Sequence, residues 1–217
     1  MYTLKMAKAI RIHELGGPNV LRWEDVQIDN PGPGEVRIRQ TAVGLNFIDT
    51  YHRTGVYPLG KLPAILGMEG AGVVEEVGSD VSEFEAGNRV AYGTAPMGAY
   101  TEERVLPARY LIHLPNNITE LEASALMVKG LTTQYLVRGS YRVKEGDTIL
   151  VHAAAGGVGL LLCQWANHLG ATVIGTVGGD DKKELALSHG CHHAILYRTE
   201  DFVERVRDLT NGRGVQV

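Results

Sequence analysis

The chain has 217 residues, a formal net charge of −4, and 44% hydrophobic against 21% charged residues. This composition is typical of globular domains and argues against a disordered or membrane-embedded chain. The acidic balance provides no long-range attraction for nucleic acid or acidic membrane surfaces. Two cysteines, Cys163 and Cys191, encode no disulfide framework, and neither a signal peptide nor a long apolar run is visible. We therefore expect a soluble, cytoplasmic protein.

Short segments with alternating hydrophobicity, separated by Gly and Pro turns, fill the first 115 residues. A period of two predicts antiparallel strands, and many short strands favour a small barrel or sandwich. A short helix is predicted at 46–54. The predicted strands are 8–13, 21–28, 35–43, 71–77, 89–92, 100–105 and 111–113.

After Pro115 the pattern changes to alternating helices and strands, which is typical of a parallel, doubly wound sheet. Gly170 and Gly190 occupy positions that suit C-terminal helix caps. The predicted domains are therefore 1–119, a β domain, and 120–217, the first part of a dinucleotide-binding domain. The predicted elements are helix 120–138, strand 148–153, helix 157–169, strand 172–177, helix 180–188, strand 194–197 and helix 199–209.

Residues 214–217 have the pattern of a fourth strand that is just beginning. A dinucleotide-binding sheet has the strand order 3-2-1-4-5-6. We therefore expect that the chain stops before its cofactor domain is complete. The exposed edge of strand 148–153 would then make the chain alone a poor catalyst that tends to associate. The alternative is a genuinely small domain with three strands.

A glycine-rich segment directly follows the first strand of the second half and opens a helix. In the dinucleotide-binding fingerprint, Ala154 takes the first glycine position, Gly156 the second and Gly159 the third. The backbone around Gly157 and Val158 would meet the pyrophosphate at the start of the helix. The context of strand, loop, helix and second strand favours cofactor binding over a plain tight turn.

The second strand of this half ends at Gly178 without the acid that NAD-binding proteins usually place there. Lys182 and Lys183 follow within one helical turn and can meet a 2′-phosphate, which favours NADPH. Asp180 and Asp181 leave two alternatives open: either replaces the missing acid, or both are helix N-caps.

Four segments resemble the quinone oxidoreductase (zeta-crystallin-like) family of the medium-chain dehydrogenase/reductase superfamily. They are GLNFIDTY at 44–51, LGMEGAG at 66–72, AAAGGVG at 153–159 and AILYRTED at 194–201. The resemblance implies a GroES-like β domain followed by an incomplete Rossmann domain, and NADPH-dependent reduction of quinones or α,β-unsaturated carbonyls. It also implies a contact of Tyr197 with the 2′-phosphate and a homodimer at full length. Residues 1–5 precede the similar region and are expected to be poorly ordered.

The superfamily's alcohol dehydrogenases bind catalytic zinc through a Cys three residues before an Asp and a His directly before a Glu. Here Asn46 stands three residues before Asp49, and Met68 stands directly before Glu69. Amide and thioether side chains are poor zinc ligands. We therefore expect no metal, direct hydride transfer from the cofactor, and no alcohol oxidation.

By resemblance, Asn46, Asp49, Tyr51 and Tyr57 line the pocket beside the nicotinamide. The amide and a phenol can hydrogen-bond a quinone oxygen as it gains charge, and Tyr51 or Tyr57, or a water they hold, can supply the proton. Two alternatives stay open at this point. The tyrosines can simply fill apolar space, and Asp49 is more plausible as a structural residue than as a general acid.

The leading hypothesis is an NADPH-dependent quinone reductase, with an enone or alkenal reductase as the nearest rival. Another class is a crystallin-like or RNA-binding protein, because some relatives have these roles, although the acidic balance argues against RNA. Outside the site, His192 and His193 are expected to be solvent-exposed rather than metal ligands, and Cys163 to be a packing residue.

Overall fold

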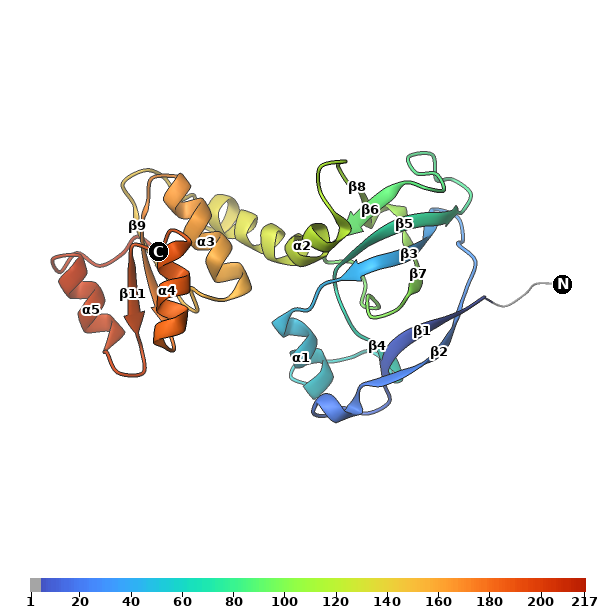
Figure 1. Ribbon diagram of the computed structural model, residues 1–217, viewed down its shortest axis with the longest axis horizontal. Helices are drawn as coiled ribbons and strands as arrows, with labels where there is room; N and C mark the ends of the chain where they lie inside the picture. Colours follow the sequence, from blue (N-terminus) through green and yellow to red (C-terminus); the bar gives the residue numbers. More distant parts are fainter. Residues whose placement is uncertain (1–4) are drawn as a thin grey trace. The chain divides into compact units, whose positions relative to one another are not determined.

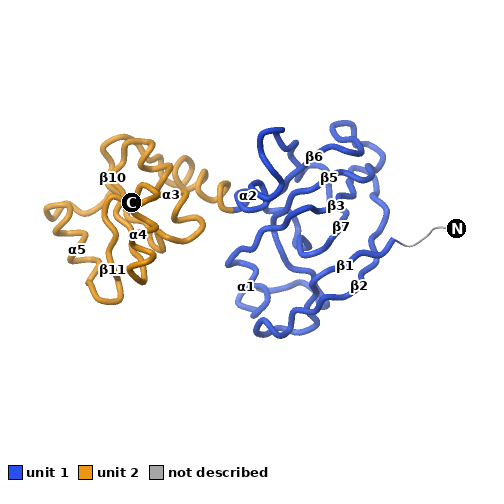
Figure 2. The backbone as a smooth tube through the Cα atoms, viewed as in Figure 1, with its two compact units in different colours: residues 1–128 blue, residues 129–217 orange. Residues whose placement is uncertain are grey.

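The computed structural model describes residues 5–217, which form two compact units that divide between Val128 and Lys129 (Figure 2). The predicted boundary lies at the start of helix α2 (Glu120–Tyr135), whereas the two units divide inside this helix. The boundary between 119 and 120 therefore stays a prediction. Residues 1–4 lie outside the described part, but the expectation that Lys5 is poorly ordered is wrong: it begins β1 and its ammonium lies 2.8 Å from the Glu103 carboxylate.

The first unit contains two antiparallel sheets and a short helix, α1 (Phe47–Thr54), as Figure 1 shows. Side chains on alternate strand positions of the larger sheet, such as Val36, Ile38 and Val74, are buried in its core, which explains the period of two. The smaller sheet has the order β2-β1-β4 and the larger one β7-β3-β5-β6-β8. The strands are β1 (Lys5–Ile12), β2 (Arg22–Ile28), β3 (Glu35–Val43), β4 (Ala64–Ile65), β5 (Gly70–Val77), β6 (Arg89–Tyr92), β7 (Glu103–Pro107) and β8 (Ile112–His113).

The predicted strand 100–105 is wrong at its beginning. The Tyr100 carbonyl accepts a hydrogen bond from Ile10 N–H at 2.8 Å, in the smaller sheet. The Glu102 carbonyl accepts from Gln40 N–H, also at 2.8 Å, in the larger sheet. The chain therefore crosses from one sheet to the other at this point, and β7 begins only after the crossing.

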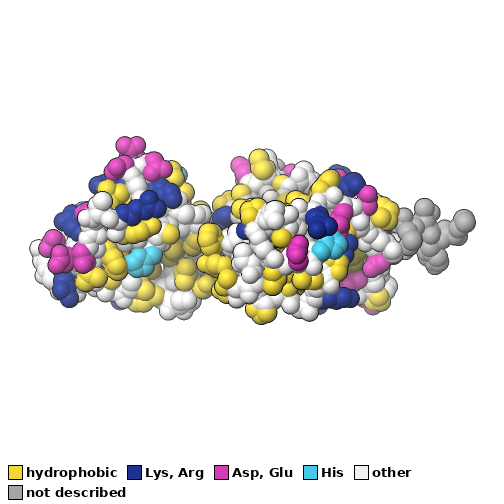
Figure 3. Space-filling view, turned by 90° about the horizontal axis from the view of Figure 1, so that it is seen from below, with side chains coloured by type: hydrophobic (Ala, Val, Ile, Leu, Met, Phe, Trp, Pro, Cys, Tyr) yellow, Lys and Arg dark blue, Asp and Glu magenta, His cyan; other side chains and the backbone are white. Residues whose placement is uncertain are grey.

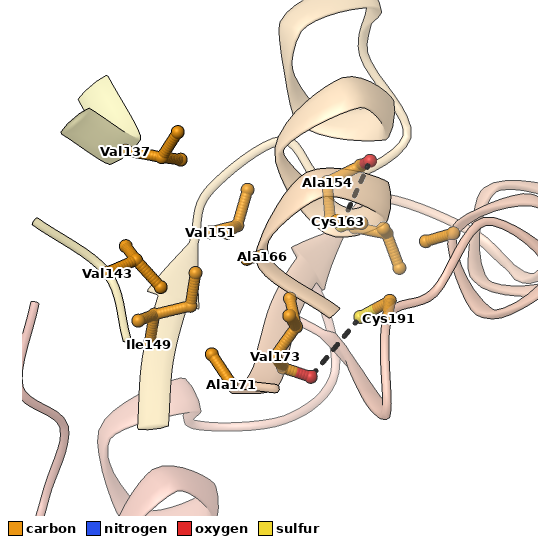
Figure 4. Close-up of a cluster of buried hydrophobic side chains, with 12 residues drawn as sticks. Val137, Val143, Ile149, Val151, Ala154, Cys163, Ala166, Ala171, Val173 and Cys191 are labelled. Carbon is orange, nitrogen blue, oxygen red and sulfur yellow. Dashed lines mark hydrogen bonds between the residues drawn. The ribbon is translucent and has the colours of Figure 1, made fainter. Parts of the chain in front are cut away.

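The second unit is a three-stranded parallel sheet with the order β11-β10-β9. One face packs against α3 and α4, with Val173 and Val177 of β10 in one cluster with Ala186 of α4. Figure 4 shows Val173 of this cluster and the fully buried Cys163 of α3. The other face packs against α5 through Ile174 and Ile195. The elements are β9 (Thr148–Val151), α3 (Gly157–His168), β10 (Thr172–Val177), α4 (Asp180–Ser188), β11 (His193–Leu196) and α5 (Phe202–Leu209), preceded by a π-helical turn at Leu136–Ser140.

The end of the chain lies along the open edge of β9. Gln216 N–H donates to the Thr148 carbonyl at 2.9 Å, and Leu150 N–H donates to the Val217 carbonyl at 2.7 Å. These two bonds place the end of the chain beside β9, on the side where the order 3-2-1-4 has its fourth strand, although residues 214–217 form no strand of their own.

Helix ends follow local chemistry. Gly170 and Gly190 have positive φ angles of 82° and 91°, as expected for the C-terminal caps. The predicted helix 199–209 starts too early, because the Asp201 carboxylate accepts from Val203 N–H and Glu204 N–H and so fixes the first turn. No helix within residues 5–217 is long and apolar enough to cross a bilayer.

Gly72 of β5 faces the backbone of β3 at close range, so its replacement tests the packing of the larger sheet. A Cβ at Gly72 would lie 2.1 Å from the Arg39 carbonyl oxygen, which is backbone and cannot move aside. We expect Gly72→Ala to lower the free energy of unfolding of this unit by about 3 kcal/mol, measured by chemical denaturation. Gly60→Ala is the control, because nothing lies within 4 Å of that position. Equal stability of the two variants would contradict this packing.

Candidate functional site

The loop after β9 turns more sharply than the sequence predicted. Strand 148–153 ends two residues early, at Val151, because Ala153 adopts a left-handed conformation with φ 51°. Left-handed backbone at a non-glycine residue is strained and is concentrated at functional sites. Ala154 follows it, fully buried, and its N–H donates to the Thr176 carbonyl at 3.1 Å.

The start of α3 approaches this loop closely. Gly156 is the N-cap residue, and a Cβ at Gly159 would lie 2.3 Å from the Ala153 carbonyl oxygen. Only glycine fits at position 159, as the fingerprint requires. Gly157 and Val158 lie in the first turn of a twelve-residue helix. The N–H groups of a first turn have no acceptor within the helix, so they favour the binding of an anion.

A hollow of about 430 Å³ lies at the carboxyl ends of the three strands. The structure brings Gly178, Lys182 and Tyr197 together there, as predicted: a Cβ at Gly178 would lie 3.1 Å from the Tyr197 hydroxyl. The lining residues are His152, Ala153, Ala155, Thr176, Val177, Gly178, Lys182, Tyr197 and Phe202.

Asp180 and Asp181 do not line this hollow. The N-cap of α4 is Gly179, so the interpretation of these aspartates as N-caps is wrong. They occupy the first turn, where carboxylates interact favourably with the positive end of the helix dipole.

His152 and Phe202 belong to the hollow but were missed by sequence reasoning. Their rings meet edge to face with centroids 5.3 Å apart, and His152 Nδ1 lies 3.0 Å from Thr176 Oγ1. The position of His152 directly before the glycine-rich loop was the available signal. Nothing local in the sequence indicates Phe202, which comes from α5.

The second group of candidate residues surrounds the N-terminus of α1, in the first unit. Asn46 is the N-cap residue, and its N–H donates to Asp49 Oδ2 at 2.9 Å. The Asn46 side-chain amide donates to Glu69 Oε1 at 2.7 Å. Glu69 Oε2 accepts from Val128 N–H at 2.6 Å. All three polar side chains are buried, so these hydrogen bonds hold the amide in one orientation.

Asp49 has a second donor. The Tyr100 hydroxyl donates to Asp49 Oδ2 at 2.7 Å. Burial and this hydrogen bond raise the pKa of Tyr100, so the phenol keeps its proton at neutral pH. Asp49 therefore ties α1 to the segment that crosses between the two sheets, a structural arrangement.

Glu69 was not among the predicted site residues, although it lies in one of the segments that carried the resemblance. It is fully buried directly before β5. A Cβ at Gly44 would lie 2.2 Å from Glu69 Oε1 and 2.1 Å from the Ser124 carbonyl oxygen. Glycine at position 44 therefore gives the carboxylate room to reach Asn46.

Tyr51, on α1, and Tyr57, in the turn after this helix, lie side by side with ring centroids 5.2 Å apart. Tyr57 N–H donates to the Tyr51 carbonyl at 3.1 Å, which fixes the turn after α1. Neither hydroxyl makes a hydrogen bond to another residue in the part of the chain that the structure describes.

Within residues 5–217, no three His, Cys, Asp or Glu side chains form a group that could hold a metal ion. The amide at the first zinc-ligand position, Asn46, donates a hydrogen bond to Glu69.

His192 and His193 are exposed, as predicted, and His192 Nδ1 accepts a hydrogen bond from Val173 N–H at 2.9 Å. Cys163 is a packing residue, also as predicted: its Sγ donates to the Ala154 carbonyl at 3.9 Å, and the neighbouring Cys191 thiol together with burial raises its pKa.

Two family models match the chain. Residues 32–116 match the alcohol dehydrogenase GroES-like domain, and residues 157–217 match the zinc-binding dehydrogenase family. Among curated proteins, the chain is 54% identical to a quinone oxidoreductase of Pseudomonas aeruginosa, with 96% of this chain and 64% of that protein covered. It is 50% identical to a 2-haloacrylate reductase of a Burkholderia species, with 98% of this chain and 65% of that protein covered.

Solved structures of quinone oxidoreductases also resemble this chain. The Escherichia coli quinone oxidoreductase in complex with NADPH matches with a TM-score of 0.95 and 45% identity, over 97% of this chain and 64% of that one. The chain thus spans slightly less than two thirds of the length of the relatives that it matches.

The hydrogen bond between Tyr100 and Asp49 should contribute measurably to stability. Tyr100→Phe leaves Asp49 Oδ2 with Asn46 N–H as its remaining donor, and Asp49 Oδ1 has no hydrogen-bond partner among the described residues. An incompletely paired buried carboxylate should cost about 2 kcal/mol in the free energy of unfolding, measured by chemical denaturation. Tyr110→Phe is the control, because that hydroxyl has only an exposed contact with Arg109 at 3.5 Å. A loss of the same size in both variants would contradict a specific role for the bond.

Proposed function

We propose that this chain, which belongs to the quinone oxidoreductase family of the medium-chain dehydrogenase/reductase superfamily, is part of an NADPH-dependent, zinc-free reductase of quinones. The observation that carries the proposal is the buried hydrogen bond from the Asn46 amide to Glu69, at the position where zinc-dependent relatives have a ligand. A carboxamide held in this way suits hydrogen bonding to a substrate oxygen rather than metal binding.

The proposed catalytic role of Asn46 follows from its donor inventory. A carboxamide has two N–H donors, and the Asn46 amide uses one of them on Glu69. The second can donate to a quinone oxygen as negative charge develops there. Because the amide is already oriented, little reorganisation is needed when the charge appears.

The proposed source of the proton is one of two phenols. Reduction of a quinone by hydride needs one proton for each hydride, and bound NADPH supplies the hydride. Tyr51 lies on α1, the helix that Asn46 caps, and Tyr57 lies in the turn after it; neither hydroxyl forms a hydrogen bond with a described residue. We propose that one of them, or a water that they hold, donates this proton.

Asp49 is proposed to act as a positioning residue. Its carboxylate accepts from Asn46 N–H and from the Tyr100 hydroxyl, so it is committed to holding the start of α1. Both hydrogen bonds join the carboxylate to groups of the chain itself, at the N-terminus of α1 and at Tyr100. This supports the structural alternative over a general acid.

The second unit fits NADPH in two respects. The close approach at Gly159 leaves the first turn of α3 open to a pyrophosphate, with Ala154, Gly156, Gly157 and Val158 around it. Lys182 and Tyr197 line a hollow that Asp180 and Asp181 do not line. A cation and a phenol without a carboxylate favour a 2′-phosphate over a free 2′-hydroxyl.

A second candidate activity is the reduction of α,β-unsaturated carbonyl compounds. It is favoured by the 50% identity to a 2-haloacrylate reductase, which is close to the 54% identity to a quinone oxidoreductase. Both substrate classes take up a hydride and a proton, so the same residues can serve either. RNA binding has less support, because acidic and basic side chains both occur on each unit on the face that Figure 3 shows.

The proposed function predicts which substrates are reduced and that zinc is not needed. Purified protein in its full natural length should oxidise NADPH with a benzoquinone or naphthoquinone, and should do so undiminished after treatment with a zinc chelator. Reduction of 2-haloacrylate alone would assign the second activity instead. Stoichiometric zinc in elemental analysis, with loss of the reaction on its removal, would overturn the zinc-free mechanism.

Lys182 should distinguish the two nicotinamide cofactors. Loss of one charge-assisted contact to the 2′-phosphate should raise the KM for NADPH about tenfold in Lys182→Ala and leave the KM for NADH nearly unchanged. Lys183→Ala is the matched control, because Lys183 faces a different hollow beside His192 and Arg205. Equal losses with both cofactors would show that Lys182 does not recognise the phosphate.

A further inference from the structure

Three aromatic rings form a continuous series on α1 and the turn that follows it. The rings of Phe47 and Tyr51 meet at 5.2 Å and 76°, and those of Tyr51 and Tyr57 at 5.2 Å and 49°. Phe47 and Tyr51 lie one helical turn apart, where side chains on one face meet. Gly55, with φ 80°, then reverses the chain and brings Tyr57 back onto Tyr51. We call Phe47, Tyr51 and Tyr57 the aromatic series.

The aromatic series is displayed rather than buried. Phe47 is 73% exposed and Tyr57 is 45% exposed, and they are flanked by Leu45 at 74% and Val56 at 65%. Asp49 is the only side chain of α1 that is buried. This helix therefore buries its acid, exposes Phe47, and leaves Ile48 and Tyr51 partly buried. Contiguous exposed apolar surface of this kind marks a site of interaction.

The series begins at the end of α1 that carries the oriented amide. Phe47 is the residue after Asn46, whose amide is held by Glu69. The N-terminal end of α1 thus carries both a hydrogen-bond donor, the Asn46 amide, and an exposed aromatic ring, that of Phe47. A planar conjugated ring that accepts a hydrogen bond from the amide can at the same time stack on, or meet edge to face, the rings beside it.

We propose that Phe47 is a specificity-determining residue of this site, which selects planar fused-ring acceptors over small acyclic ones. The inference rests on the proposed function and deepens it. In the aromatic series the ring centroids of Phe47 and Tyr51, and those of Tyr51 and Tyr57, are each 5.2 Å apart. A single quinone ring is about large enough to contact one ring of the series, whereas a fused bicyclic acceptor can contact Phe47 and a tyrosine together. An acyclic enone has no ring face and gains little from Phe47.

The decisive variant is Phe47→Leu, which keeps an apolar side chain of similar size but removes the aromatic face. With the protein in its full natural length, kcat/KM for a naphthoquinone should fall about tenfold, whereas kcat/KM for an acyclic enone should stay within about twofold. Phe47→Tyr should restore the naphthoquinone value. Val56→Ala, a change in the same exposed patch outside the aromatic series, should leave both values unchanged.

A binding measurement separates this inference from the proposed function. The affinity for 2-naphthol, a planar aromatic that cannot accept a hydride, should fall about tenfold in Phe47→Leu by calorimetry. If quinones are reduced but neither readout depends on Phe47, the inference fails and the proposed function stands. If no quinone is reduced but 2-naphthol binding depends on Phe47, the inference stands and the quinone function fails. Equal losses for naphthoquinone and acyclic enone would overturn the inference by indicating a structural role.

Discussion

The buried carboxylate of Glu69 is the constraint on which the candidate site of the first unit depends. It lies directly before β5 and accepts hydrogen bonds from the Asn46 amide and from Val128 N–H. A buried charge is tolerated only where its partners are in place, and removing one partner is costly. The start of α1 is therefore held at this carboxylate, and the aromatic rings of the helix take their positions from it. Gly44 makes the arrangement possible, because a side chain there would collide with the carboxylate.

The second unit depends on a different kind of close approach. At Gly159 the helix after the loop comes so near to the Ala153 carbonyl that no side chain fits. The left-handed backbone at Ala153 turns the chain into that position. The consequence is an open first turn of α3 beside the hollow lined by Lys182 and Tyr197. The two units thus differ in chemistry: the first holds buried polar side chains and aromatic rings, and the second presents the backbone N–H groups at the start of α3.

Local patterns in the sequence predicted most elements well and failed where a single residue interrupts a pattern. Four elements were predicted at their observed limits: the strands β3, β6 and β10, and the helix α4. In each of them a clear periodicity is bounded by turn residues. Strand 148–153 was predicted two residues too long because alternation does not reveal a left-handed residue such as Ala153. The predicted start of α5 was early because the cap at Asp201 outweighs the apolar pattern before it.

The sequence by itself determined the two fold classes, the glycine-rich loop after β9, and the residue types at positions 46 and 68, where zinc-dependent relatives have ligands. These depend on residue type and short spacing. Only the tertiary structure decided which polar groups meet. Glu69 and Val128 are 59 positions apart and Asp49 and Tyr100 are 51 apart, and each pair forms one hydrogen bond. No periodicity encodes such a contact, because it results from the crossing of two sheets and the docking of a helix. The same reason explains why Phe202, from a distant helix, joined the hollow without any signal in its own neighbourhood.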